Sequence, residues 1–317
     1  LLWFPSHDRV GAAWFSRLSS GWADLFKPSR YATSLKLLPA ALERQWPLAL
    51  SALVLLFVLT QRTRRLPERL AELAQPLARV RTDRYRYTVQ ALFATLAAAL
   101  VWPLPLALLG WLLRQAGQAG KFSDSLGSAL ITTAGALFFY TFLRWLIVEN
   151  GVARRHFRWT AQRRDAIRAC LPWFLGLLLP SQFLLLLAFV REQEPAFDAV
   201  ARLMLILICA VSGWQFWKLL APGALWSVRG VADPEPVRLR QVLRVALPLC
   251  AFAIVHLTLF GYVLSATLLV HAFWLSLTLI VALSILHGLV SRWLLLGERR
   301  LALKRLDLRR ETEAATA

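Results

Sequence analysis

Charged side chains are absent from seven long stretches of this 317-residue sequence, although the chain carries 37 Lys and Arg residues. These stretches are residues 45–61, 87–113, 125–143, 169–190, 203–217, 245–260 and 267–291. A helix needs about 20 apolar residues to cross a bilayer, and a flanking Lys or Arg can extend a shorter one. With 58% hydrophobic and 17% charged residues, the sequence excludes an ordinary soluble domain. It predicts an all-α, polytopic transmembrane bundle of about seven spanning helices.

Several signatures of chemistry are also missing. The three cysteines, Cys170, Cys209 and Cys250, have no C-x-x-C spacing and no neighbouring His pair, so neither a disulfide framework nor a metal site is indicated. A Gly-rich phosphate-binding loop is absent too. The lack of Asp, Glu, Lys and Arg inside the seven stretches argues against an ion-coupled carrier with a carboxylate relay and against an intramembrane hydrolase. We therefore expect no enzymatic activity and no cofactor.

Basic residues alternate between rich and poor loops. The six loops and the C-terminal tail contain, in chain order, 8, 2, 7, 2, 5, 0 and 7 Lys and Arg residues. Short basic loops stay on the cytoplasmic side of a membrane. We therefore expect the N-terminus outside and four segments in the cytoplasm: 62–86, 144–168, 218–244 and 292–317.

The net charge of +19 would indicate nucleic acid only if the basic side chains shared one face of a soluble domain. Here they flank apolar stretches, where each Lys or Arg near an anionic leaflet contributes about 1 kcal/mol of attraction. We therefore expect membrane lipids, especially anionic inner-leaflet head groups, as partners and no nucleic acid. The candidate lipid-anchoring residues are Arg62, Arg64, Arg65, Arg154, Arg155, Arg158, Arg299 and Arg300.

Three histidines interrupt the last apolar run, and His256 is the most central of them. His256, His271 and His287 are spaced by 15 and 16 residues, which is not the spacing of a metal pair on one helix. His256 is a candidate intramembrane polar residue, either a proton sensor or a link between helices. The alternative is a neutral imidazole that is hydrogen-bonded to a neighbouring helix.

The chain divides into three parts. Residues 1–44 mix aromatic and charged residues and are expected to form an extracytoplasmic lead-in at the interface. Residues 45–291 form the seven-helix transmembrane domain, and residues 292–317 form a basic cytoplasmic helix that continues the last span. Because the sequence begins at Leu1, we expect a fragment of a longer chain.

Prolines and small residues predict the details of these spans. Pro103 and Pro105 are expected to kink or end the second span, and Pro172 and Pro180 to bend the fourth. Gly261 is expected to break the run 245–291 at a tight turn over Gly261–Ala266. The small residues within 94–99 and 127–135 are expected to let helices approach closely.

Four strings carry a resemblance to a known family. They are RTDRYRYT at 81–88, GVARRHFRW at 151–159, GYVLSAT at 261–267 and RWLLLGERRLAL at 292–303. In this order they resemble the transmembrane region that precedes the channel domain in large MscS-superfamily mechanosensitive channels, the MscK and MscM type. The resemblance runs through the whole chain.

This resemblance implies a multi-pass protein of the bacterial inner membrane, with a periplasmic N-terminus, that assembles as a homo-oligomer, a heptamer in this family. The pore domain would follow residue 317 in the same chain. The protein would open under membrane tension and release ions and small solutes on hypo-osmotic shock. Since the family's Gly/Ala-rich pore helix is missing here, these residues are expected to sense tension or to scaffold the pore. Two alternatives stay open: a stand-alone transporter or membrane enzyme, and a purely structural membrane anchor.

Overall fold

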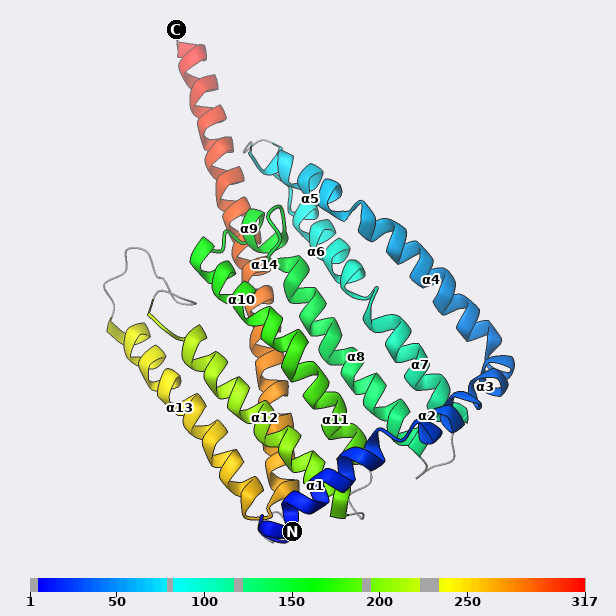
Figure 1. The fold of residues 1–317 in the computed structure, drawn as a ribbon. Coiled ribbons are helices and arrows are strands. Elements are labelled where there is room, and N and C mark those ends of the chain that lie inside the picture. Colours follow the sequence, from blue (N-terminus) through cyan, green and yellow to red (C-terminus); the bar gives the residue numbers. More distant parts are fainter. Residues whose placement is uncertain (1–4, 79–81, 117–121, 190–194, 223–233, 317) are drawn as a thin grey trace.

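The computed structural model describes residues 5–78, 82–116, 122–189, 195–222 and 234–316. Every regular element within these ranges is a helix. Figure 1 shows the long helices side by side in one bundle, with the N-terminus at its lower end and the C-terminus beyond its upper end. The predicted all-α bundle is confirmed.

Three short helices lie across the lower end of the bundle (Figure 1): α1 (Ala12–Leu25), α2 (Pro28–Leu35) and α3 (Leu38–Arg44). Pro28 and Pro39 each stand in the first turn of a helix, where the missing N–H of proline costs no hydrogen bond. Tyr31 donates to the carbonyl oxygen of the buried Leu25 at 2.9 Å, which holds α2 against α1. This path suits the interfacial lead-in expected for residues 1–44, which stays a prediction.

The first three passes run through α4 to α8. They comprise α4 (Trp46–Arg64), α5 (Leu66–Ala74) with the 3-10 turn η1 (Gln75–Ala78), α6 (Tyr85–Ala99), α7 (Pro103–Ala116) and α8 (Phe122–Leu146). The bend between α6 and α7 is 48°. It falls directly before Pro103, because a proline cannot donate the hydrogen bond that would continue the preceding helix.

A widened turn marks the fourth pass. After the short α9 (Val152–Arg155), α10 (Ala161–Trp173) continues through a π-helical turn, η2 (Phe174–Leu178), into α11 (Leu179–Phe189). The N–H of Leu179 bonds to the carbonyl of Phe174, five residues back. Pro180 follows directly, and its ring would press on the carbonyl four residues earlier in a regular helix. The chain therefore accommodates this proline by the wider turn.

The last three passes are α12 (Pro195–Leu219), α13 (Pro234–Leu259) and α14 (Val263–Thr316). α12 begins eight residues before the predicted span 203–217. Asp198 and Arg202 form an ion pair within the helix, so these charged residues do not mark its start. The turn before α14 is shorter than the expected Gly261–Ala266, and its Gly261 has a φ of 93°, which favours glycine. α14 is one helix of 54 residues, so the last predicted span and the basic tail share one element.

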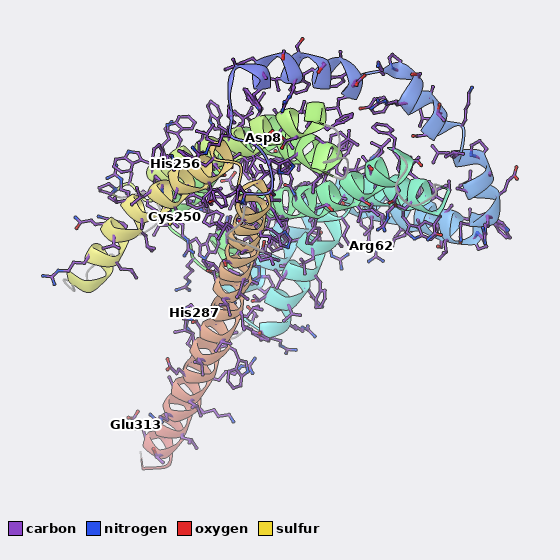
Figure 2. The ribbon with its side chains drawn as sticks, turned by 90° about the horizontal axis from the view of Figure 1, so that it is seen from below. Asp8, Arg62, Cys250, His256, His287 and Glu313 are labelled. Carbon is purple, nitrogen blue, oxygen red and sulfur yellow. The ribbon has the colours of Figure 1, made fainter. Side chains whose placement is uncertain are left out.

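Six helices of the described residues are long and apolar enough to cross a membrane, and the bent pair α6 and α7 would make a seventh span. They follow the order of the seven predicted stretches. α12 is central, with 67% of its apolar window buried, whereas this share is 11% in α4, 6% in α13 and 0% in α14. The peripheral helices turn apolar side chains outward, as lipid-facing helices do. α13 and α14 diverge from their shared turn (Figure 2), so α14 is only partly covered by the bundle.

Two glycines set the contact between α7 and α8. A Cβ on Gly110 would lie 2.6 Å from the carbonyl oxygen of Gly127, and a Cβ on Gly127 would lie 2.5 Å from that of Gly110. No other residue fits there unless the helices move apart. Gly135, on the same helix as Gly127, has nothing within 4 Å of its added Cβ.

The elements of the Lys- and Arg-rich loops and of the C-terminal tail lie at one end of the bundle. In Figure 1, α5, α9, the C-terminal end of α12 and the C-terminal part of α14 lie at the top, while α1 to α3 and the turn between α13 and α14 lie at the bottom. The alternation of basic loops therefore corresponds to the two ends of one bundle. We call the end that holds α5 and α9 the basic end.

Candidate functional site

Arg292 of α14 and Asp83, just before α6, form a buried ion pair at the basic end. Nη2 of Arg292 lies 2.7 Å from Oδ1 of Asp83, and the two residues are 7% and 4% exposed. Removing charges from water costs several kcal/mol per ion, and the attraction offsets this only when further hydrogen bonds complete the site. The pair therefore depends on its neighbours.

Thr88 and His156 supply these hydrogen bonds. Nε of Arg292 donates to the Thr88 hydroxyl oxygen at 2.6 Å, and Nη1 of Arg292 donates to the His156 carbonyl oxygen at 3.4 Å. The Thr88 hydroxyl also lies 3.0 Å from Nδ1 of His156. Asp83, Thr88, His156 and Arg292, called here the Arg292 cluster, thus join the start of α6, the residue after α9, and α14.

The imidazole of His156 is held neutral inside this cluster. Burial, and second the positive charge of Arg292, lower the pKa of His156 from 6.5 to about 4. The Thr88 oxygen accepts a hydrogen bond from Arg292, and its own proton can be donated to Nδ1 of His156; in that tautomer the imidazole proton is on Nε2. Nε2 is buried and has no hydrogen-bond partner among the described residues.

The loop that follows α9, residues 156–160, contacts both α10 and α14. A Cβ on Gly288 of α14 would lie 2.9 Å from the ring of Phe157, so the ring rests on a glycine. Arg158 has a φ of 55°, in the left-handed region that residues other than glycine rarely adopt. The guanidinium of Arg163 lies 4.0 Å from the centre of the Trp159 ring. Contacts on both sides therefore fix this loop.

A cavity of about 570 Å³ lies between this loop, α10 and α14, and we call it the arginine cavity. Four arginines line it, Arg158, Arg163, Arg292 and Arg299, and no Asp or Glu does. Of these, only Arg292 forms an ion pair within the described part of the chain. A hollow that is lined by charge of one sign attracts ions of the other sign.

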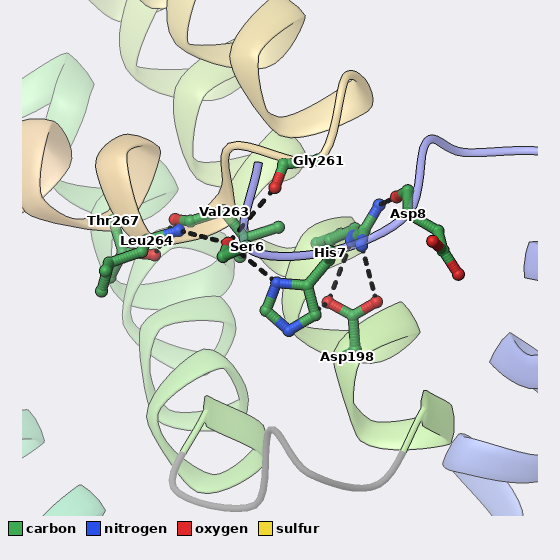
Figure 3. Close-up of polar contacts among 9 residues, drawn as sticks. Ser6, His7, Asp8, Asp198, Gly261, Val263, Leu264 and Thr267 are labelled. Atoms are coloured by element: carbon green, nitrogen blue, oxygen red, sulfur yellow. Dashed lines mark hydrogen bonds and ion pairs between the residues drawn. The ribbon is translucent and has the colours of Figure 1, made fainter. Parts of the chain in front are cut away.

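At the opposite end, the segment before α1 pairs with the turn between α13 and α14 (Figure 3). The N–H groups of Ser6 and His7 donate to the Gly261 carbonyl oxygen at 3.1 and 3.2 Å, and the N–H of Val10 donates to that of Leu259 at 3.0 Å. The Ser6 hydroxyl donates to the Gly261 oxygen as well, at 3.2 Å. Ser6 to Val10 are thus tied to this turn along their backbone.

Asp198 and Arg202 of α12 hold the same segment from a second side. Nη2 of Arg202 lies 2.9 Å from Oδ2 of Asp198, and both side chains are buried. Nη1 of Arg202 donates to the Asp8 carbonyl oxygen at 2.7 Å, and Nε2 of His7 lies 3.6 Å from Oδ1 of Asp198. We call these contacts, together with those at Gly261, the N-terminal clamp. It joins the lower ends of α12, α13 and α14.

Two of the eight arginines predicted to anchor lipid, Arg158 and Arg299, line the arginine cavity. Arg154 instead pairs with Glu149 at 2.8 Å, and Arg155 donates to Asn150 at 3.1 Å. The remaining four lie at the basic end outside the cavity: Arg62, Arg64, Arg65 and Arg300. Lipid anchoring stays a prediction for all eight.

His256 lies on the exposed face of α13 (Figure 2). The centroid of its ring is 6.4 Å from that of Phe252 and 4.5 Å from that of Phe260, one helical turn to each side. Within the described residues it has these ring contacts but no hydrogen bond to a neighbouring helix. Its role as an intramembrane polar residue stays a prediction.

Sequence reasoning did not identify the Arg292 cluster. Its members belong to three of the strings that carry the family resemblance, at 81–88, 151–159 and 292–303. Asp83 and Arg292 are 209 residues apart, so no local pattern pairs them. The common membership in these strings was the available signal.

A family model described as mechanosensitive ion channel inner membrane domain 1 matches residues 46–317. Escherichia coli strain K12 has a relative named miniconductance mechanosensitive channel MscM, which is 23% identical over 239 residues. The match covers 75% of this chain and 21% of that protein, so the chain spans about a fifth of the relative's length. No solved structure matches the chain.

Proposed function

Because the chain belongs to the family of mechanosensitive ion channel inner membrane domains, we propose that it is the membrane-embedded sensor or scaffold region of a tension-gated channel. The whole channel would release ions and small solutes on hypo-osmotic shock. Its pore would lie outside residues 1–317. The relative named as a mechanosensitive channel supports this reading.

The observation that carries this proposal is the attachment of α14 to the rest of the bundle through the Arg292 cluster. The Arg292 guanidinium bonds to Asp83 before α6, to Thr88 in the first turns of α6 and to the His156 carbonyl oxygen after α9. Beyond Arg292, α14 continues without a break to Thr316, a length of about 36 Å at the usual helical rise. A movement of the bundle would therefore displace the helix that leads toward the next part of the chain.

Membrane tension can act on this bundle through its peripheral helices. Few residues in the apolar windows of α4, α13 and α14 are buried, and two spans are interrupted, one by the bend between α6 and α7 and one by the π turn η2. Stretching thins the bilayer and changes hydrophobic mismatch at a modest cost per Å. Summed over several helices, this cost can shift an equilibrium between two channel states.

The placement of buried charge supports a sensor or scaffold over a carrier or membrane enzyme. Among the described residues, the buried Asp, Glu, Lys, Arg and His side chains are Asp83, His156 and Arg292 at the basic end and Asp198 and Arg202 at the other. A carrier or intramembrane enzyme would place such groups near the middle of the membrane. A purely structural anchor remains the third reading, under which the Arg292 cluster would affect stability but not gating.

Orientation and assembly extend the same proposal. We infer that the basic end lies in the cytoplasm and the N-terminus in the periplasm, because short loops rich in Lys and Arg stay on the cytoplasmic side. The region would contact anionic lipids of the inner leaflet of the inner membrane. It would also contact the downstream pore domain of its own chain, in a homo-oligomer that the resemblance makes a heptamer.

The test is to remove residues 1–317 from the product of the whole gene and to record single channels in membrane patches. A sensor predicts a changed pressure threshold with conduction retained, together with altered survival of hypo-osmotic shock. An unchanged threshold and unchanged survival would leave only the scaffold reading. Loss of conduction by a protein that still reaches the membrane in normal amounts would contradict a pore outside this region.

A further inference from the structure

We propose that the arginine cavity binds the phosphate of one anionic phospholipid, whose acyl chain enters the apolar cavity next to it. The inference rests on the proposed function in one respect, the cytoplasmic placement of the basic end. It differs from the general attraction of basic loops to a leaflet, because it assigns one lipid to one built site. A free phosphate ion shares the headgroup chemistry and is separated from the lipid by the experiment below.

The arginine cavity holds positive charge that is mostly uncompensated. Arg158, Arg163 and Arg299 line the cavity without an acidic partner among the described residues, and Arg292 shares its charge with Asp83 alone. Arginine binds phosphate oxygens by paired, charge-assisted hydrogen bonds. An anion among these side chains would relieve their mutual repulsion.

The buried imidazole of His156 adds a polar group to the same cavity. His156 lines the cavity, is 2% exposed, and leaves Nε2 without a hydrogen-bond partner among the described residues. In the tautomer in which Nδ1 accepts from Thr88, Nε2 carries the proton and is a donor. A buried donor without an acceptor costs free energy, and a phosphate oxygen would supply the acceptor.

An apolar cavity adjoins the arginines. It measures about 200 Å³ and shares Trp159, Arg163, Ile280 and Ser284 with the arginine cavity. Its lining is mainly apolar and reaches Trp274 on α14, 18 residues from Arg292 and so about 27 Å along the helix. This distance between Trp274 and Arg292 exceeds the depth of one leaflet, about 15 Å of hydrocarbon, so the apolar cavity extends to the depth of the acyl chains. A soluble phosphate would leave this second cavity unused, whereas part of an acyl chain can occupy it.

Arg158 lies in the wall of the arginine cavity in an unusual backbone conformation. Its left-handed φ of 55° is a sparsely populated conformation, and such conformations occur often at ligand clamps. The conformation places Arg158 in the wall of the cavity between Phe157, packed on Gly288, and Trp159, stacked with Arg163. The loop is therefore held in shape before any ligand binds.

The test is photo-crosslinking in nanodiscs, using the product of the whole gene and phosphatidylglycerol that carries a diazirine in its acyl chain. Labelled peptides are identified by mass spectrometry. We expect labelling of Ile167, Leu277 or other residues that line the apolar cavity. An excess of unlabelled phosphatidylglycerol should suppress it, whereas phosphatidylcholine and inorganic phosphate should not.

The double variant Arg158→Gln, Arg299→Gln should reduce this labelling at least about tenfold, the change expected when one charge-assisted hydrogen bond is lost. The matched control is Arg154→Gln, Arg155→Gln, which removes two arginines from the same end that do not line the cavity. Equal labelling in both double variants would overturn the site. Equal labelling by diazirine-bearing phosphatidylcholine, or suppression by inorganic phosphate, would overturn the phospholipid. None of these outcomes depends on the pressure threshold, so the site and the proposed function can fail separately.

Discussion

Asp83 and Arg292 lie 209 residues apart in sequence, yet their side chains meet at 2.7 Å in a buried ion pair at the basic end. Asp83 belongs to the segment that leads into α6, and Arg292 stands on α14 where that helix leaves the bundle. The contact therefore links the membrane helices to the part of α14 that extends beyond them.

Replacing Arg292 by Gln should lower the free energy of unfolding by about 3–5 kcal/mol, because it leaves Asp83 buried without a charge partner. The double variant Asp83→Asn, Arg292→Gln should lose less than the two single variants together. Reversible unfolding in mixed micelles measures all three. Arg154→Gln breaks the exposed pair with Glu149 and should cost no more than about 1 kcal/mol. A loss at Arg292 no larger than this control would show that the pair does not stabilise the fold.

Acid should weaken the fold through His156. Its folded pKa, about 4, lies below the unfolded value of 6.5, so the unfolded state binds the proton more readily. The stability that this group contributes is full above pH 6.5 and is lost as the pH falls toward 4. His156→Asn keeps a polar group near Nδ1 but does not titrate. Its destabilisation relative to the wild type should shrink by about 2–3 kcal/mol between pH 7.5 and 4.5, and a constant difference would refute the buried neutral imidazole.

A methyl group at the contact of α7 and α8 should separate these helices. Gly110→Ala and Gly127→Ala should each destabilise the protein by about 1–3 kcal/mol, since the new Cβ meets a backbone oxygen. Gly135→Ala, in open space on α8, should be neutral or stabilising by up to about 1 kcal/mol through helix propensity. Thermal unfolding of the three variants decides the matter, and equal shifts would argue against the close contact.

The N-terminal clamp depends on Gly261. Its positive φ disfavours any other residue, and a Cβ there would collide with the His7 carbonyl group. Gly261→Ala should therefore speed hydrogen exchange at the N–H groups of Ser6, His7 and Val10 by at least about tenfold, as their acceptors shift. Gly297→Ala in α14 has open space around it and is the control. Unchanged exchange at all three amides would show that the clamp does not need this turn.

His256 separates the channel proposal from the carrier or enzyme alternative. The imidazole lies on the outer face of α13 between two phenylalanine rings, so His256→Phe should keep these contacts. We expect an unchanged pressure threshold and unchanged survival of hypo-osmotic shock. Loss of a solute-dependent activity of this region in the variant would instead favour a carrier or an enzyme.

The number and order of the spans followed from the absence of charge, because a membrane helix cannot leave many charged side chains in hydrocarbon. The same rule failed at α12, which begins before Arg202. Asp198 is one turn away and pairs with Arg202, so two charges that looked like a span boundary lie buried inside the helix. The spacing of four residues between Asp198 and Arg202 is visible in the sequence and is compatible with an ion pair on one helix. The burial of this pair is not visible there, because it depends on the N-terminal segment that packs against Arg202.

The arginine cavity and the Arg292 cluster were harder to predict from the sequence. Counting Lys and Arg by loop gave the eight candidate anchors but could not separate Arg158 and Arg299 from the others, because every loop arginine has the same composition signal. Arg163 and Arg292 entered the site only once α10 and α14 were placed in space. The positive φ of Arg158 also has no sequence signal, since residues other than glycine rarely adopt the left-handed region.

The pressure threshold of a charge-swap series at Asp83 and Arg292 tests the central claim most directly. Single channels of the whole-gene product are recorded for Asp83→Arg, for Arg292→Asp and for the two changes together, with Arg154→Glu as a control for charge at the same end. If α14 is coupled to the bundle through this pair, each single change shifts the threshold, the double change restores it in large part, and the control leaves it unchanged. Thresholds equal to the wild type in both single variants, with normal amounts of protein in the membrane, would contradict the coupling.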